Sequence, residues 1–373
     1  MIPLSLYIHL PWCVKKCPYC DFNAHPLKDN TDLEGYIKRL VEDLHSHQSI
    51  LESRPIRSIF IGGGTPSLFS AQQLAPLFQA IQQYQDISKI EITIEANPGT
   101  QDCASYSGYV DLGINRISIG GQSFNPAMLT NLGRIHNGDL THQAIIQAQN
   151  AGFKRINLDI MYGLPHQTLQ EALDDLQQFI DYKLEHLSWY QLNIEANTLF
   201  AVKKPELPSD DMINDMDLAG SHLLIKNGYR QYEISAWTRN QPSFHNLNYW
   251  HFGDYLGIGC GAHSKITQTN PFKIERVIKH KHPKAYMNHL IQELKEVPKS
   301  DVILEYCIGQ FRTLDPLDLD TFEKRTQLHR DHLIQALKSA SEAGLLTITP
   351  STISLTDKGF RHHNELCLSL VKQ

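Results

Sequence analysis

The sequence lacks three features, and each absence argues against a class of protein. It has no apolar run near the about 20 residues that a membrane-spanning helix requires. It does not begin with a basic segment followed by an apolar one, as a secretory signal does. It has no basic excess to form a nucleic-acid footprint, because its formal net charge is −6 and its pI is near 6.3. We therefore expect a soluble protein of the cytoplasm that binds no nucleic acid.

Cysteine is also scarce, with 7 in a chain of 373 residues. Four of the cysteines are scattered and are interpreted as core or surface thiols: Cys103, Cys260, Cys307 and Cys367. This distribution does not suggest the disulfide framework of an exported protein, so we expect a reducing compartment. The chain is long enough for two or three domains with a sizeable core.

The other three cysteines lie together, as Cys13, Cys17 and Cys20, directly after the apolar run of residues 4–10. Positions spaced in this way can share one face of a helix. Pro18 argues against a helix, because it removes a backbone donor and moves Cys17 away from the α conformation. The segment is therefore predicted to be a loop with three thiols facing inward.

Three chemistries are open to such a loop. A zinc site needs a fourth ligand nearby, and neither His9 nor His25 lies at a familiar zinc-ligand spacing. A disulfide leaves one thiol over. An iron–sulfur cluster fits better, because thiolates are its usual ligands. Three protein ligands on a four-iron cluster leave one iron open to a small molecule.

Six strands, each followed by a helix, are predicted at a spacing of roughly 30 residues. The strands cover residues 4–10, 58–61, 90–96, 115–119, 156–161 and 187–192, and the helices include 31–51, 101–112, 140–151 and 210–227. Capping boxes at Ser70 with Gln73 and at Thr168 with Glu171 begin two further helices. Repeated β/α units predict a parallel sheet with right-handed crossovers. There are too few units for a full eight-stranded barrel.

Polar residues gather where these strands end, as the cysteine loop, the glycine run 62–64, Glu95, Gln122 and Asp159. In a β/α barrel the carboxyl ends of the strands form the active-site face. The glycine run lacks the lysine and the spacing of phosphate-binding motifs, and it could be either a tight turn or a close approach to a ligand. Glu95 and Asp159, taken singly, are equally well explained as strand-end residues in water.

A strand over 231–236 is predicted to lead into the segment His245-Asn-Leu-Asn-Tyr-Trp250, which we interpret as a loop. A histidine beside large aromatic residues can bind heme iron while the rings stack on the porphyrin. On chemistry alone, ordinary loop packing is the more frequent explanation. Beyond residue 300, helices over 301–312, 318–326 and 330–343 precede the short strands 345–348 and 352–355. That order is typical of a winged-helix fold.

The cysteine motif, with an aromatic residue before its last cysteine, resembles the signature of the radical S-adenosylmethionine (radical SAM) superfamily. The resemblance implies a partial (β/α)6 barrel and a [4Fe–4S] cluster on Cys13, Cys17 and Cys20. It also implies that the open iron binds S-adenosylmethionine, which electron transfer cleaves to a 5′-deoxyadenosyl radical. Positions that match the S-adenosylmethionine contacts of the family are Tyr7, Gly63, Gly64, Thr65, Glu95, Gln122, Arg134 and Asp159.

Nearly the whole chain further resembles the HemW family of heme chaperones, close relatives of the oxygen-independent coproporphyrinogen III oxidase. His245, Asn246, Tyr249 and Trp250 match the heme motif of that family, with His245 as the heme-iron ligand. The resemblance implies heme, heme-acceptor proteins at the membrane surface and an electron donor such as a flavodoxin or ferredoxin. It also implies peripheral contact with the membrane for a cytoplasmic protein.

Two features favour the chaperone over the oxidase, which is the alternative. Only 12 residues precede Cys13, whereas the oxidase has a longer extension there, and Phe22 stands where the oxidase has a further cysteine. One departure from the family is Gly121, where a larger apolar residue is usual. We expect an α/β protein with a barrel domain over 1–235, a heme-motif extension over 236–299 and a winged-helix-like α+β domain over 300–373.

Overall fold

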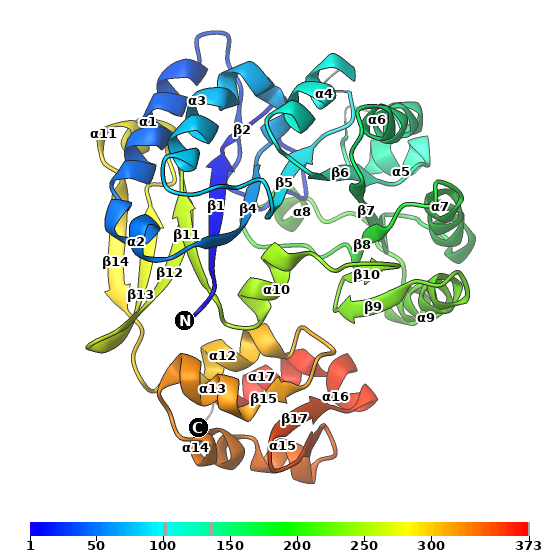
Figure 1. Cartoon of the computed structure of the whole chain (residues 1–373). Helices are drawn as coiled ribbons and strands as arrows, with labels where there is room; N and C mark the ends of the chain where they lie inside the picture. The colour runs from blue at the N-terminus through cyan, green and yellow to red at the C-terminus, as the bar shows by residue number, and fades with distance from the viewer. Residues whose placement is uncertain (100–102, 135–136, 372–373) are drawn as a thin grey trace.

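The computed structural model describes residues 1–99, 103–134 and 137–371. Its main sheet has the strand order β14-β13-β12-β11-β1-β4-β5-β6-β7-β8-β10-β9. The six predicted strands are confirmed as β1 (Leu4–Leu10), β4 (Ile56–Gly63), β5 (Glu91–Ala96), β6 (Arg116–Gln122), β7 (Arg155–Tyr162) and β8 (His186–Gln191). Neighbours among these six pair in parallel, and the sheet curves into a partial barrel with helices on its outside (Figure 1).

The strands alternate between an apolar outer face and a polar inner face. In β1, Leu4, Leu6 and Ile8 pack beneath the helices and are at most 1% exposed. The residues between them, such as Ser5 and Tyr7, face the barrel interior, where the Ser5 hydroxyl lies 2.8 Å from that of Ser58. Burial of both faces is usual for parallel strands covered by helices. The interior of this barrel is therefore a polar space rather than a second hydrophobic core.

The outer helices largely follow the prediction. They are α3 (Ala71–Gln82), α4 (Cys103–Asp111), α6 (Gly138–Asn150), α7 (Leu169–Asp181) and α9 (Asp210–Lys226), and both capping boxes form. The single helix predicted over 31–51 was wrong, since the segment forms α1 (Leu33–His45) and α2 (Gln48–Ser53). The break lies at Ser46 and His47. The Ser46 hydroxyl donates to the carbonyl of Asp43 in the last turn of α1, and the buried carboxylate of Asp43 pairs with Lys279.

The segment after the barrel differs from its prediction in two places. The strand expected over 231–236 is an antiparallel hairpin of β9 (Arg230–Glu233) and β10 (Ala236–Thr238). The loop expected around His245 is a short helix, α10 (Phe244–Trp250). Ser243 caps this helix, because its hydroxyl accepts from the Asn246 backbone N–H. The first two N–H groups of the helix, those of Phe244 and His245, are satisfied by Glu91 of the distant strand β5, which the local sequence does not reveal.

Further strands extend the sheet on the other side of β1. They are β11 (Asp254–Ile258), which is parallel to β1, and the antiparallel β12 (His263–Thr269), β13 (Phe272–Lys279) and β14 (Ile291–Glu296). The shorter elements are β2 (Trp12–Cys13), β3 (His25–Pro26), the 3₁₀ turn η1 (Pro66–Leu68), α5 (Pro126–Asn131), α8 (Leu199–Val202) and α11 (Pro283–Asn288).

The last part of the chain has an apolar core, which Phe252 and Ile274 of the preceding segment join, and a three-stranded sheet, as a winged-helix-like fold requires. Its elements are α12 (Val302–Gln310), β15 (Leu317–Asp318), α13 (Leu319–Thr326), α14 (Arg330–Ala336), α15 (Lys338–Glu342), β16 (Leu346–Ile348), β17 (Thr352–Leu355), α16 (Asp357–Arg361) and α17 (His363–Val371). Figure 1 shows α10 between the barrel and this region. The predicted domain boundaries stay a prediction.

Candidate functional site

A cavity of about 460 Å³ occupies the barrel and reaches the carboxyl ends of its strands. This volume lies within the range of small-molecule sites. The lining includes most of the residues predicted for the cluster and for S-adenosylmethionine: Cys13, Cys17, Cys20, Gly63, Gly64, Thr65, Glu95, Gln122, Arg134 and Asp159. Tyr7 is not part of the lining. Of the heme-motif residues, only Asn246 is.

The cysteine loop is attached to the glycine segment through backbone contacts. The Gly64 N–H donates to the Leu10 carbonyl at 2.8 Å, and the Thr65 N–H donates to the Trp12 carbonyl at 2.7 Å. A Cβ on Gly64 would lie 2.4 Å from the Trp12 carbonyl oxygen, which no side chain tolerates. Gly64 is therefore needed for close packing against the cysteine loop. This role is separate from the two that the sequence left open, a tight turn and a close approach to a ligand.

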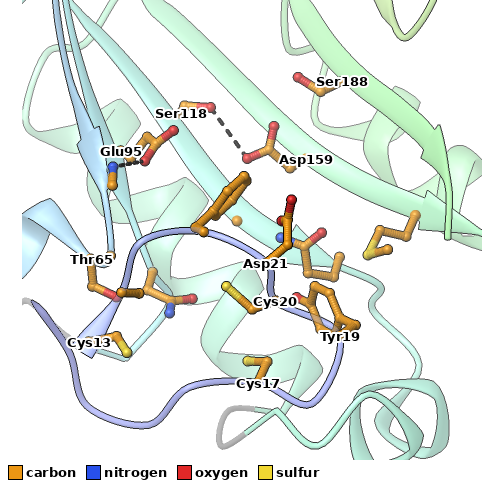
Figure 2. A pocket seen from close by; sticks show the side chains of 18 of the residues that line it. Cys13, Cys17, Tyr19, Cys20, Asp21, Thr65, Glu95, Ser118, Asp159 and Ser188 are labelled. Atoms are coloured by element: carbon orange, nitrogen blue, oxygen red, sulfur yellow. Dashed lines mark hydrogen bonds between the residues drawn. The ribbon is translucent and has the colours of Figure 1, made fainter. Parts of the chain in front are cut away.

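The three thiols lie at the edge of the cavity (Figure 2). The predicted loop is confirmed for Cys17 and Cys20, whereas Cys13 ends the two-residue strand β2. Burial raises the pKa of the Cys13 thiol to about 11, and Cys20 and Cys17 add to this while Lys16 opposes it. A bound metal centre reverses such a shift, because it stabilises thiolate. The described residues contain no group of three His, Cys, Asp or Glu side chains placed to hold one metal ion.

Both histidines near the loop have ring nitrogens engaged by protein groups, both nitrogens in His9 and Nε2 in His25. His9 Nδ1 lies 2.9 Å from the Tyr7 hydroxyl, and His9 Nε2 lies 2.9 Å from the Asn23 carbonyl. His25 Nε2 lies 3.1 Å from the Lys281 carbonyl. The Tyr7 hydroxyl is engaged by His9. The Tyr7 ring lies behind the cavity wall and stacks on Phe60, with the ring centroids 6.3 Å apart.

Two carboxyl groups line the middle of the cavity (Figure 2). Glu95 accepts from the Gly63 N–H at 3.0 Å, while Asp159 accepts from the Asn157 amide at 2.8 Å and from the Ser118 hydroxyl at 3.4 Å. Burial, and then the charge of Asp159, raise the pKa of Glu95 to about 8. Burial also raises the pKa of Asp159, against the effect of its hydrogen bonds. Glu95 therefore carries a proton at neutral pH and can donate a hydrogen bond to a ligand.

Gln122 and Arg134 also line the cavity, and hydrogen bonds hold both side chains in place. Gln122 adopts a left-handed backbone conformation with φ of 68°, and its Oε1 accepts from the Tyr190 hydroxyl at 2.7 Å. The Arg134 guanidinium donates to the Gly120 carbonyl at 2.6 Å and to the Asn97 side chain. It also approaches the Cys17 sulfur at 3.8 Å. Arg134 therefore connects the cysteine loop to the end of β6 and places a positive charge beside one thiol.

The heme motif lies at the other end of the strands. His245 is 2% exposed, and its Nδ1 is 3.0 Å from the hydroxyl of Ser58, near the start of β4. The glycine run begins within the last two residues of β4, and Gly63 is five residues after Ser58, which corresponds to about 16 Å of strand. The heme motif is therefore not adjacent to the cysteine loop. Asn246 nevertheless lines the cavity, so the cavity extends toward both ends of the barrel.

The rest of the motif is packed between the barrel and the C-terminal region. The Tyr249 ring lies 5.0 Å from the His245 ring, one helical turn earlier. The Arg312 guanidinium lies 4.4 Å above the Trp250 ring, and a Cβ on Gly309 would lie 2.7 Å from the Trp250 carbonyl. These two aromatic rings therefore have protein partners already.

Several cavity residues escaped the sequence interpretation. They are inner-face residues of the strands and their loops: Phe60, Asn97, Arg116, Ser118, Asn157, Ser188 and Tyr190. Polar residues at every second position of β6, β7 and β8, within otherwise apolar strands, were the signal that could have identified most of them. That alternation indicates a polar barrel interior.

Comparison with known proteins identifies the family. The Radical SAM superfamily matches residues 7–179, and the HemN C-terminal domain matches residues 297–362. The heme chaperone HemW of Haemophilus influenzae is 46% identical over 98% of this chain and 97% of its own. The chain belongs to the HemW family. The HemW of Escherichia coli is 43% identical with the same coverage of both chains.

This HemW-family chain also shares its fold with a solved oxidase. The coproporphyrinogen III oxidase HemN of Escherichia coli superposes with a TM-score of 0.84 at 22% identity, over 99% of this chain and 90% of that one. The likeness confirms the radical SAM barrel and the C-terminal region. Membership of the radical SAM superfamily implies a [4Fe–4S] cluster and S-adenosylmethionine. No described helix is long and apolar enough to cross a membrane.

Proposed function

We propose that this protein is a heme chaperone, which binds heme and transfers it to acceptor proteins. The observation that carries the proposal is the 46% identity with a heme chaperone along 98% of the chain. The likeness to the oxidase is a likeness of fold at 22% identity. Acceptors at the membrane surface, and a flavodoxin or ferredoxin as electron donor, belong to the same proposal.

His245 is the proposed ligand of the heme iron. Its Nδ1 faces the Ser58 hydroxyl, whereas its buried Nε2 has no hydrogen-bond partner among the described residues. Burial, and then the charge of Arg116, lower the pKa of His245 to about 3, so the ring is neutral at physiological pH. A neutral imidazole with one nitrogen held and the other open is suited to bind iron. In this proposal the Ser58 hydroxyl orients the ring.

At the other end of the cavity, Cys13, Cys17 and Cys20 are the proposed cluster ligands, and three thiols at the cavity edge are the donor set that the cluster takes. When bound, the cluster and S-adenosylmethionine supply one-electron reductive chemistry. The proposed S-adenosylmethionine contacts are Gly63, Gly64, Thr65, Glu95, Gln122, Arg134 and Asp159, with Tyr7 behind them. In this proposal Glu95 donates a hydrogen bond as a neutral acid, and Arg134 holds the cysteine loop.

One experiment separates the chaperone from the oxidase. The anaerobically reconstituted protein is given heme in one sample and coproporphyrinogen III, S-adenosylmethionine and a low-potential reductant in another. We expect a Soret band from bound heme and no consumption of coproporphyrinogen III. Steady formation of protoporphyrinogen IX would instead show that the protein is an oxidase.

The role of His245 has its own test. His245→Ala removes the open nitrogen, and we expect heme binding at least about tenfold weaker with a shifted Soret band. His245→Gln keeps an amide near Ser58 and controls for packing, and it should lose iron ligation as well. His282→Ala, in the exposed residue that caps α11, should bind heme normally. An unchanged heme spectrum in both His245 variants, with cluster absorbance retained, would refute this role.

A further inference from the structure

The cavity contains a buried positive charge without an ionic partner. Arg116, the first residue of β6, is 2% exposed and lines the cavity. Its Nη1 lies 3.4 Å from the Thr93 hydroxyl, its Nη2 lies 3.4 Å from His186 Nδ1, and its Nε has no partner. No ion pair within the described ranges includes Arg116. A guanidinium has five N–H donors, so this one is largely unsatisfied.

The contact with His186 is not a hydrogen bond, because both nitrogens carry protons. The Asn157 amide donates to the Asp159 carboxylate at 2.8 Å, which orients the Asn157 carbonyl toward His186 Nδ1 at 2.6 Å. That nitrogen must therefore be N–H. His186 Nε2, at 2.8 Å, accepts from the Tyr232 hydroxyl. With Nδ1 occupied in this way, the long contact with Thr93 is the one hydrogen bond left to Arg116 within the part of the chain that the structure describes.

The neighbouring arginine shows what a satisfied charge looks like in this barrel. Arg155 is the register partner of Arg116 on β7. It donates to Glu91 at 2.6 Å and to Glu185 at 2.9 Å. Arg116 and the Asp159 carboxyl group influence each other by charge, but they lie farther apart than an ion pair. Asp159 already accepts hydrogen bonds from Asn157 and Ser118. Leaving a buried charge without a partner is costly, which suggests that a ligand supplies the missing anion.

We propose that Arg116 anchors a carboxylate-binding subsite in the deep part of the cavity, and that its occupant is a propionate group of heme. This inference rests on the proposed function. Two unsatisfied polar groups approach this part of the cavity, the Arg116 guanidinium in its lining and His245 Nε2. The His245 ring lies 5.1 Å from the ring of Phe60, which lines the cavity. Phe60 and Asn246 complete this end of the lining. Heme offers iron to the imidazole and carboxylate to the guanidinium, whose planar fork fits a carboxylate with two hydrogen bonds.

The first test needs no variant. The wild-type protein is titrated anaerobically with heme and with heme dimethyl ester, which has no carboxylate. A charge-assisted hydrogen bond in a buried site corresponds to a difference of about 10- to 100-fold in affinity, so the acid should bind tighter by that factor. Equal affinity for the acid and the ester would overturn the inference while leaving the heme chaperone intact. Absence of binding by either compound would remove the proposed function itself.

Variants then assign the preference to Arg116. Arg116→Gln keeps donors but removes the charge, so we expect heme to bind about 10- to 100-fold more weakly and the dimethyl ester to bind as before. Arg116→Lys keeps the charge and should retain part of the preference for the acid. Arg57→Gln is the matched control, because Arg57 is an exposed arginine on β4 of the same sheet, with β5 between it and β6. The cluster absorbance confirms in each case that the barrel is folded.

Two results would contradict the assignment. Equal weakening of heme and its ester in Arg116→Gln would show that Arg116 only supports the fold. Weaker binding of S-adenosylmethionine in this variant, with heme binding unchanged, would show that the carboxylate belongs to the methionine part of S-adenosylmethionine. Equilibrium binding of S-adenosylmethionine to each variant, measured without reductant, distinguishes this source from heme.

Discussion

The two ends of the barrel handle their polar groups differently. At the carboxyl ends of the strands, the candidate groups lie on loops that line the cavity, as with the half-buried Cys17 and Cys20. At the other end, the groups lie on strands and on α10, and they are buried among one another, as with His245 at 2% exposure. The first arrangement presents side chains to a ligand, whereas the second holds side chains in place. A ligand can therefore reach the cysteine loop more readily than the heme motif.

The amino end of the barrel is held by a buried carboxylate. Glu91 accepts from the backbone N–H groups of His245 at 3.0 Å and Phe244 at 3.1 Å, and it pairs with Arg155 at 2.6 Å. The C-terminal region closes the same end, where the Ile234 N–H donates to the Arg312 carbonyl at 2.9 Å. The position of α10 thus depends on residues from three distant parts of the chain. The comparison predicts that a substitution at one end of the barrel leaves ligand binding at the other end unchanged.

The largest expected effect is at the cysteine loop. Cys17→Ser should abolish the cluster absorbance of the anaerobically reconstituted protein, because a four-iron cluster cannot replace a missing thiolate ligand here. Heme binding to the same variant should persist, since His245 lies at the opposite end of the strands. Cys367→Ser, in the C-terminal helix α17, is the control and should keep the cluster. A full cluster in Cys17→Ser would show that the ligand set is wrong.

The next effect concerns the support of α10. Glu91→Gln turns one acceptor into a donor that faces backbone N–H groups or Arg155, so we expect the free energy of unfolding to fall by about 2 to 4 kcal/mol. The Soret band of bound heme should shift, and the cluster content should stay unchanged. Glu185 contacts the same arginine without touching α10. Glu185→Gln should therefore lower the free energy of unfolding by less, and it should not shift the Soret band. Identical Soret spectra for the two variants would contradict this role of Glu91.

A smaller expected effect depends on pH and concerns Glu95, at the end of the barrel that carries the cysteine loop. The folded state raises the pKa of Glu95 to about 8 from 4.5, so its contribution to stability is present below pH 4.5 and is lost as the pH rises toward 8. Glu95→Gln resembles the protonated acid at every pH. We expect it to stabilise the cluster-free protein by about 1 to 3 kcal/mol at pH 8, and by little at pH 4.5.

Urea unfolding at the two pH values checks this prediction. Glu293→Gln, on the exposed strand β14, should show no such difference. A Glu95→Gln gain that is the same at both pH values would mean that packing, and not ionisation, is responsible.

The smallest effect is at Gly121. A Cβ there would lie 2.9 Å from Thr141 Cγ2 and 3.0 Å from Leu158 Cδ1, both in buried side chains. Gly121→Ala should therefore lower the free energy of unfolding by about 1 kcal/mol through overpacking. Thr141→Ser removes the clashing methyl group, so it should restore part of that loss in the double variant. A double variant that is merely additive would exclude the clash as the cause.

Much of the site could be predicted, because its residues lie in short contiguous segments. The cysteine motif, the glycine run and the ends of β5, β6 and β7 each carry their own local signal, and the β/α order brings the strand ends together. The helix α10 could not be predicted in this way. Its seven residues are too few for a periodic pattern, and its N–H groups are satisfied by Glu91, 153 and 154 positions earlier. Tertiary contacts supplied the stability that local propensity lacked.

The sequence by itself determined the repeated β/α units and the cysteine motif, because strand alternation and compact motifs are properties of neighbouring residues. The resemblance that these motifs carry then implied the partial barrel and the family. Only the tertiary structure decided that His245 keeps an open nitrogen and that Arg116 lacks the carboxylates that Arg155 has. The physical reason is that hydrogen-bond satisfaction depends on every group that folding brings within about 3 Å. Partners in this barrel interior come from different strands, so no local pattern records which group is left without one.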